Sequence, residues 1–201
     1  MYSDFVADLG GRVESLAPRS KAAVFWVLGC GMLSDLDMSA ELASHELPAD
    51  WANWFAGARE AGYRFVTAGE VEPEASALWA RAVDGGDTGE FASTLINSAV
   101  NCLGTPLGIA IDPEFARRAG SSVEGAFEPL FQSVSLELFE DVAVPDDDEE
   151  IDEVFVQPRF QVAVNFVVDL VARLSTTPTP DAATLDTLLS GAHVLAPPTN
   201  E

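Results

Sequence analysis

Apolar side chains recur at intervals of three and four residues along most of this chain, and this spacing predicts α-helices. The first such stretch places Phe5, Leu9 and Val13 on one helical face. Ser3 precedes that face, and serine is a common residue at the start of a helix. Because amphipathic helices bury their apolar faces against one another, the repeated pattern predicts an all-α fold, a multi-helix bundle.

Capping signals predict further helix starts. Asp87 with Glu90 three residues later has the form of a capping box, so we expect a helix start ahead of Phe91. Ser121 with Glu124 has the same spacing and predicts another start.

The final quarter of the chain holds its most hydrophobic helical stretch. We expect this helix to run from about Ile151, with a bend near Pro158, to Leu174. Valine, phenylalanine and leucine side chains occupy more than one of its faces from Phe160 onward. We therefore expect residues 160–174 to form the central helix of the core.

A dense acidic run, PDDDEEIDE at residues 145–153, precedes that helix. Adjacent like charges repel and nothing apolar anchors the run, so we expect a loop. A Ca²⁺ or Mg²⁺ site there is a lesser alternative, because the run lacks the spacing of an EF-hand. We expect one helical domain over residues 1–196, with the acidic loop inside it, and a flexible tail over 197–201.

Two short stretches depart from the helical pattern. Tyr63 and Phe65 alternate with other residues, as do Leu107, Ile109 and Ile111. Alternation with a period of two is typical of β-strands. A minor two-stranded ribbon beside the helices is therefore an alternative for these two stretches.

The charge balance restricts the class of partner. Thirty-three acidic against ten basic residues leave a net charge of −23, and Lys21 is the only lysine. Nucleic acids and anionic membranes are bound through lysine and arginine, so we expect neither as a partner. Such a charge attracts a basic protein partner and steers its approach. Solubility, or adaptation to high internal salt, is the alternative reason for the acidity.

Cysteine usage and the first residues indicate an intracellular protein. Cys30 and Cys102 each lie in an apolar helical stretch, and we expect two buried free thiols. Met1 to Leu9 lacks the basic segment of a signal peptide. The longest apolar run, Ala22 to Leu33, is too short to span a bilayer. We therefore expect a cytoplasmic location.

Motifs for cofactors and metals are incomplete. His45 and Glu46 begin like a metalloprotease helix, but Ala49 stands where the second histidine is needed. Gly29 and Gly31 resemble the start of a dinucleotide-binding loop, yet the third glycine is missing and the run is helical. These small residues predict the close approach of another helix. We expect no cofactor and no metal.

Two helical stretches have a polar ridge. Polar residues recur every four positions from Gln161 to Arg173, and a similar ridge runs from Thr94 to Asn101. If both ridges face inward they line a polar pocket; otherwise each faces solvent. The candidate pocket residues are Asn97, Asn101, Asn165 and Asp169.

An aromatic group at Trp51, Trp54 and Phe55 allows two interpretations. The spacing from Trp51 to Phe55 and Ala58 puts these residues on one helical face, which favours a place in the core. Tryptophan is also common at binding surfaces, so an interface is the alternative.

In size, acidity, helical character and the lack of a catalytic set, the chain resembles bacterial toxin-neutralising immunity proteins, without a shared motif. The leading hypothesis is a non-enzymatic acidic binding protein that captures a basic partner protein. A toxin with a cationic active site is one example, and imitation of nucleic acid is a variant. The candidate contact residues are Asp146, Asp147, Asp148, Glu149, Glu150, Asp152 and Glu153.

Two other classes of function stay open. One is a carboxylate-dependent hydrolase or a small-molecule-binding protein that uses the inner polar helix faces. The other is a structural subunit of an oligomer. A deep pocket lined by the four candidate residues favours the first of these, and an acidic face without a pocket favours partner capture.

Overall fold

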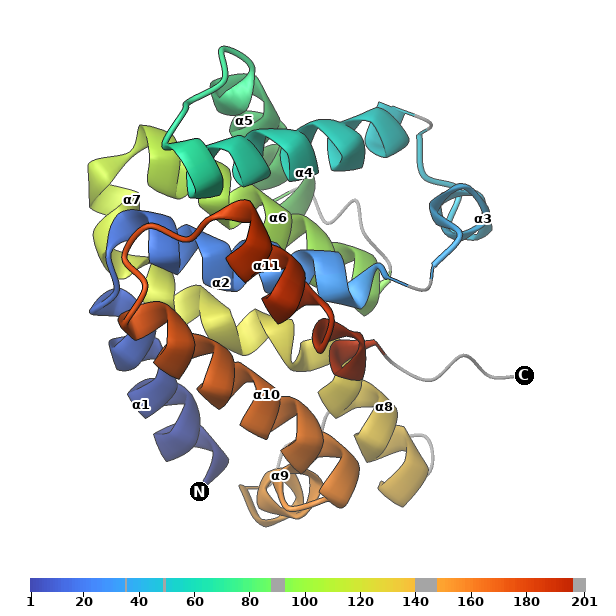
Figure 1. Cartoon of the computed structure of the whole chain (residues 1–201). Coiled ribbons are helices and arrows are strands. Elements are labelled where there is room, and N and C mark those ends of the chain that lie inside the picture. Colours follow the sequence, from blue (N-terminus) through green and yellow to red (C-terminus); the bar gives the residue numbers. More distant parts are fainter. Residues whose placement is uncertain (35, 49, 88–92, 140–147, 197–201) are drawn as a thin grey trace.

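The computed structural model of the chain describes residues 1–34, 36–48, 50–87, 93–139 and 148–196. Over these residues the backbone forms α-helices and 3₁₀-helices and no β-strand, which confirms the all-α prediction (Figure 1). The helices are α1 (Tyr2–Glu14), α2 (Pro18–Met32), α3 (Met38–Ser44), α4 (Asp50–Ala68), α5 (Ala75–Asp87), α6 (Thr94–Ile111), α7 (Pro113–Arg118), η1 (Ala119–Ala126), α8 (Glu128–Phe139), α9 (Asp148–Phe155), α10 (Pro158–Ser175), α11 (Ala182–Leu189) and η2 (Ala192–Leu195).

The alternative of a two-stranded ribbon is wrong. Tyr63 and Phe65 lie within α4, and Leu107, Ile109 and Ile111 lie within α6. Helix α6 is packed against α2, α4 and α5. A helix enclosed on several sides carries apolar residues at many positions, and some of them alternate by coincidence.

Helix α2 is the centre of the core. Every residue from Ser20 to Met32 is buried. Figure 1 shows α2 running through the middle of the molecule, with α4 above it and α10 below it, and both helices pack against it. A helix buried on all sides is one that other helices surround.

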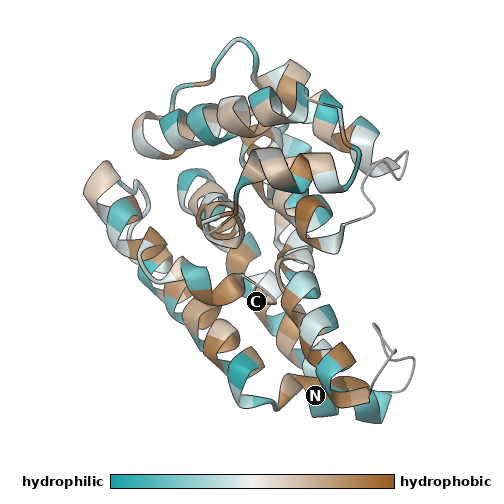
Figure 2. Cartoon of the chain, turned by 90° about the vertical axis from the view of Figure 1, so that its right-hand side faces the viewer, coloured by the Kyte–Doolittle hydropathy of each residue, from teal (hydrophilic) through white to brown (hydrophobic). Residues whose placement is uncertain are grey.

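The prediction of a central helix over residues 160–174 is therefore wrong. Helix α10 buries one side, which includes Val167, while Val162 on another side is 53% exposed and Phe166 is half-buried. Some apolar residues of α10 therefore lie outside its buried face, and other helices do not surround it. In Figure 2 hydrophilic and hydrophobic residues alternate along the outer helices, as expected for helices with one buried side.

The acidic run also differs from its prediction. The loop expected over 145–153 is wrong from residue 148 onward, because α9 begins there, and 145–147 lie outside the described residues. Three acids in the first turn of α9 complement the helix dipole, and the buried Val154 and Phe155 anchor the helix. The chain then turns by 75° into α10, whose first residue is Pro158.

Glycines in α2 allow neighbouring segments to approach closely, as the sequence predicted. A Cβ atom on Gly29 would lie 2.7 Å from Cγ of Leu103 in α6. One on Gly31 would lie 2.5 Å from Cβ of Ala192 in η2. Both positions lack room for any side chain.

The buried polar side chains of α2 have hydrogen-bond acceptors. The Ser20 hydroxyl donates to the carbonyl of Thr177 at 2.7 Å, and Nζ of Lys21 donates to the carbonyl of Ala116 at 2.6 Å. Burial lowers the pKa of Lys21. These bonds tie α2 to α7 and to the segment after α10, and they offset the cost of burying polar atoms.

Some helix boundaries differ from the predicted ones. Ser3 lies inside α1 instead of capping it, and Asp87 belongs to the end of α5. Helix α6 starts after Ser93, whose side chain accepts the cap hydrogen bond. Glu90 lies outside the described residues, as does the predicted tail 197–201.

The aromatic group of α4 belongs to the core, as its spacing predicted. Trp51, Trp54 and Phe55 are each at most 5% exposed. The rings of Trp54 and Phe55 meet edge to face with centroids 5.2 Å apart.

Among the described helices, α6 is long and apolar enough to cross a membrane by length and composition. The bent pair of α9 and α10 passes the same test only when taken together. Within the protein 67% of α6 is buried, so its position in the core accounts for its hydrophobicity.

Candidate functional site

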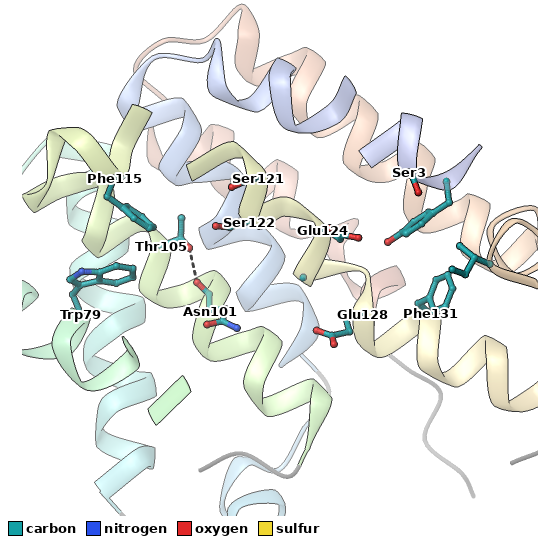
Figure 3. A pocket seen from close by; sticks show the side chains of 13 residues that line it. Ser3, Trp79, Asn101, Thr105, Phe115, Ser121, Ser122, Glu124, Glu128 and Phe131 are labelled. Atoms are coloured by element: carbon teal, nitrogen blue, oxygen red, sulfur yellow. Dashed lines mark hydrogen bonds between the residues drawn. The ribbon is translucent and has the colours of Figure 1, made fainter. Parts of the chain in front are cut away.

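A cavity of about 680 Å³ opens between α1, α6, η1 and α8 (Figure 3). Ligand pockets usually have volumes of roughly 300–1,000 Å³, so this cavity has room for a ligand or a partner's side chain. We call it the acidic pocket. The residues that line it are Tyr2, Ser3, Trp79, Asn101, Thr105, Phe115, Ser121, Ser122, Glu124, Gly125, Glu128, Phe131 and Ile151.

The 3₁₀-helix η1 supplies one wall of the acidic pocket. The capping box predicted at Ser121 and Glu124 is wrong, since both residues lie inside η1. The Ser121 hydroxyl donates to the carbonyl of Arg118 at 3.0 Å instead of accepting a helix-start hydrogen bond. The Glu124 side chain is left to face the pocket.

Helix α1 is held against η1 by a contact between two glycines. A Cβ on Gly10 would lie 3.3 Å from the carbonyl oxygen of Gly120, and a Cβ on Gly120 would overlap Gly10. This close packing places the first turn of α1, with Tyr2 and Ser3, at the pocket.

Tyr2 is fixed by contacts to α8 and α9. Its backbone N–H donates to Oδ1 of Asp152 in α9 at 2.8 Å. Its ring lies 5.4 Å from that of Phe131 and 5.6 Å from that of Phe155, centroid to centroid. Tyr2 is only 8% exposed.

The Tyr2 hydroxyl has no hydrogen-bond partner in the described part of the chain. Burial raises the pKa of Tyr2, and the negative charges of Glu124 and Glu128 raise it further. Tyr2 lines the same pocket as these two glutamates.

Glu124 and Glu128 form a pair of carboxylates without a counter-ion. They are four residues apart, across the junction of η1 and α8. Neither side chain forms an ion pair or hydrogen bond with the residues that the structure describes, and the pocket lining contains no lysine, arginine or histidine. Burial raises the pKa of Glu128, and repulsion from Glu124 adds to it.

Aromatic rings form the far end of the acidic pocket. The rings of Trp79 and Phe115 lie with centroids 4.6 Å apart, and Gly108 of α6 leaves room for both. Between this end and the glutamates lie Asn101 and Thr105, whose hydroxyl donates to the Asn101 carbonyl at 2.7 Å (Figure 3).

Neither of the two cysteines lines the acidic pocket. Among the described residues, no three side chains of histidine, cysteine, aspartate or glutamate gather as metal ligands. Cys30 and Cys102 are buried free thiols, as predicted, and burial raises their pKa values to about 11 and about 12. Both are protonated at neutral pH, so neither is a ready nucleophile.

The four residues predicted to share a polar pocket do not line one pocket. Asn101 lines the acidic pocket, and its Nδ2 donates to Oδ1 of Asn97 at 3.4 Å. Asn165 and Asp169 are exposed on α10. The polar ridge of α10 is the solvent side of an amphipathic helix, which was the other interpretation of the pattern.

The predicted acidic contact residues that the structure describes lie on α9, which borders the acidic pocket through Ile151. Asp146 and Asp147 lie outside the described residues. The acids of α9 are Asp148, Glu149, Glu150, Asp152 and Glu153, all exposed or half-exposed. Ile151 of α9 lines the pocket. Asp152 has a structural contact: the N–H of Tyr2 donates to it and lowers its pKa.

Most residues of the acidic pocket were not predictable from the sequence. Tyr2 and Trp79 gave no signal, because residues far apart in sequence meet there only through helix packing. Glu124 and Glu128 did leave a signal. Their spacing of four places two acids on one side of the segment, and the buried Phe127 and Phe131 lie on another side.

Comparison with known proteins gave no match: neither a protein-family model, nor a curated protein, nor a solved structure is significantly similar to this chain. The geometry of the acidic pocket is therefore the basis for a functional proposal.

Proposed function

We propose that this protein is a non-enzymatic binding protein that captures a basic partner protein, with the acidic pocket and the acids of α9 as its contact site. The main support is the pair Glu124 and Glu128, which face a cavity without a counter-ion among the described residues. Carboxylates that have no partner within the chain are free to bind a cation from outside it.

The overall charge supports the same proposal. A net charge of −23 attracts a basic protein over long distances and speeds its association. The exposed acids Asp148 and Glu153 lie on α9, which contributes Ile151 to the pocket. These acids then guide the partner toward the pocket, and the pocket binds one of the partner's side chains.

A bacterial cytoplasmic protein that neutralises a basic toxin fits this description. Covering a cationic active site with an acidic surface blocks the toxin's substrate, which is the role proposed for this chain. Imitation of nucleic acid is a variant, because a toxin that binds phosphates also binds carboxylates.

A carboxylate-dependent hydrolase is the alternative that the same pocket allows. That chemistry needs one carboxyl group kept neutral in an apolar site and another kept ionised. Glu124 and Glu128 are both exposed and lie on consecutive turns of one segment. Neither side chain is enclosed in an apolar site, which favours ion binding over divided acid and base roles.

Affinity capture with two matched variants tests the proposal. In Glu124→Gln/Glu128→Gln the pocket loses both charges. In the control, Glu70→Gln/Glu74→Gln, two exposed glutamates four residues apart outside the pocket are neutralised. Each variant changes the net charge by the same amount.

Wild-type protein and the control variant are expected to retain the same basic protein from cells of the source organism. The pocket variant is expected to retain it at least about tenfold less, since charge-assisted hydrogen bonds are lost. Equal retention by both variants, or enrichment of no basic protein, contradicts the proposal. Hydrolytic activity lost only in the pocket variant would establish the alternative.

A further inference from the structure

Tyr2 brings a mostly buried side chain with an unpartnered hydroxyl to the wall of the acidic pocket. The Tyr2 side chain is 8% exposed and lines the cavity, and its hydroxyl has no partner in the described residues. This oxygen is not among the enclosed polar atoms that lack a partner, so it is accessible from the cavity and can accept a hydrogen bond there. A ligand donor in the pocket would satisfy this oxygen.

The charges around that hydroxyl define the sign of the ligand. Glu124 and Glu128 are the only acidic side chains among the lining residues, and none of these residues is basic. Two carboxylates and a hydroxyl oxygen together offer several acceptors on one side of the cavity. A cation with several N–H donors matches this set.

The remaining walls define the shape of that cation. Figure 3 shows Glu124 and Glu128 between the aromatic pair of Trp79 and Phe115 and the ring of Phe131. A planar guanidinium stacks on aromatic faces and is weakly hydrated, so it enters such a site more readily than a compact ammonium. A bare divalent metal would gain nothing from the aromatic walls.

We propose that the acidic pocket receives an arginine side chain, whose guanidinium donates to the carboxylates of Glu124 and Glu128 and to the hydroxyl oxygen of Tyr2. The aliphatic stem of the arginine lies along the aromatic walls. This inference rests on the proposed function, in which the arginine belongs to the basic partner.

Gly125 offers a way to close the pocket without removing any charge. It lines the cavity, and a Cβ at this position meets no atom within 4 Å. Gly125→Leu therefore puts a side chain into free space in the pocket. Gly86→Leu is the matched control, since a Cβ there also meets nothing and Gly86 does not line the pocket.

Three tripeptides with capped termini test which side chain the pocket binds. They have the form glycine–X–glycine, where X is arginine, its uncharged analogue citrulline, or lysine. Binding is followed by ¹H–¹⁵N NMR at the indole N–H of Trp79 and the amide of Ser122. The full chain and its four variants are first checked for native spectra.

The arginine peptide is expected to bind wild type, Gly86→Leu and Glu70→Gln/Glu74→Gln alike. Citrulline is expected to bind at least about tenfold more weakly and lysine several-fold more weakly. Gly125→Leu and Glu124→Gln/Glu128→Gln are expected to lose the shifts at Trp79 and Ser122. Equal affinities for arginine and citrulline, or unchanged binding by Gly125→Leu, overturn the inference.

This test separates the arginine site from the proposed function. Capture of a basic protein that needs Glu124 and Glu128, without arginine-peptide binding in the pocket, overturns the arginine site alone. Peptide binding in the pocket without capture of any basic protein supports the arginine site and counts against the partner.

Discussion

The core around α2 and the acidic pocket differ in whether key polar side chains have hydrogen-bond partners within the described part of the chain. In α2 the buried side chains of Ser20 and Lys21 each donate to a carbonyl of another element. At the acidic pocket, Tyr2, Glu124 and Glu128 have no side-chain hydrogen bond or ion pair among the described residues. Both regions belong to one bundle and differ in what their polar atoms contact.

This difference separates the part of the molecule that maintains the fold from the part available to a ligand. A buried polar group with a partner in the chain adds to stability, while an accessible group without one can bind a ligand at little cost to the fold. Unsatisfied groups in a native protein gather where function needs them. Substitutions in the two regions should therefore differ in their effects on stability and on binding.

Phenylalanine truncation should show the largest contrast. Phe25 of α2 is fully buried, so Phe25→Ala is expected to lower the free energy of unfolding by about 3–5 kcal/mol. Phe166 of α10 is half-buried, and Phe166→Ala should cost about 1–2 kcal/mol, in proportion to its buried area. Urea denaturation measures both, and an equal loss in the two variants would contradict the central place of α2.

Removal of one hydroxyl from each region should give a smaller contrast. Ser20→Ala leaves the Thr177 carbonyl without its donor and is expected to cost about 1–2 kcal/mol. Tyr2→Phe removes a hydroxyl that has no partner, so the expected change is below about 0.5 kcal/mol. A large loss for Tyr2→Phe would reveal a stabilising bond and remove the argument for a missing ligand.

The pH dependence of stability should change slightly at Glu128. Its pKa is raised in the folded state, so the folded protein binds more protons than the unfolded chain just above the ordinary pKa of glutamate. Stability from this group is thus present at low pH and is lost as pH rises through the raised pKa. Glu128→Gln should lose less stability than wild type between about pH 4 and pH 7.

Urea midpoints across this range measure the effect on stability. Glu70→Gln controls for the loss of one negative charge outside the pocket. Parallel curves for wild type and Glu128→Gln would show that Glu128 has no special environment.

The acids of α9 should affect encounter with a partner and hardly affect stability. Asp148→Asn with Glu153→Gln neutralises two exposed side chains beside the pocket. Association with the captured basic protein is expected to slow a few-fold, with little change in dissociation. The effect should shrink as salt rises from about 50 to about 300 mM, because screening shortens the range of the charges. Association rates measured by stopped flow that depend neither on these substitutions nor on salt would contradict steering by α9.

The fold was predictable to the extent that local spacing determines it. Helical periodicity predicted the all-α class, and the aromatic face at Trp51 was correctly assigned to the core. Apolar residues ranked α10 above α2 as the central helix, and this ranking was wrong. Gly29 and Gly31 were the better guide, because a helix with room for neighbours on several sides is a central one.

The acidic pocket was less predictable, because it depends on contacts between distant segments. Tyr2 and Glu124 line one pocket because α1 packs on η1 through Gly10 and Gly120. The polar ridge of α6 did contribute Asn101 to a pocket, although its partners came from elements other than α10. Repulsion between like charges misled the prediction for α9, whose buried end anchors the helix.

The most direct test of the account is an NMR titration of the Glu128 carboxyl group, with and without the arginine peptide. Without peptide, the account predicts a pKa above the ordinary range of glutamate, because burial and Glu124 disfavour the charge. With peptide bound, the pKa should fall, since a guanidinium stabilises the carboxylate. An ordinary pKa that the peptide leaves unchanged would contradict the claim that these carboxylates form a binding site for a cation.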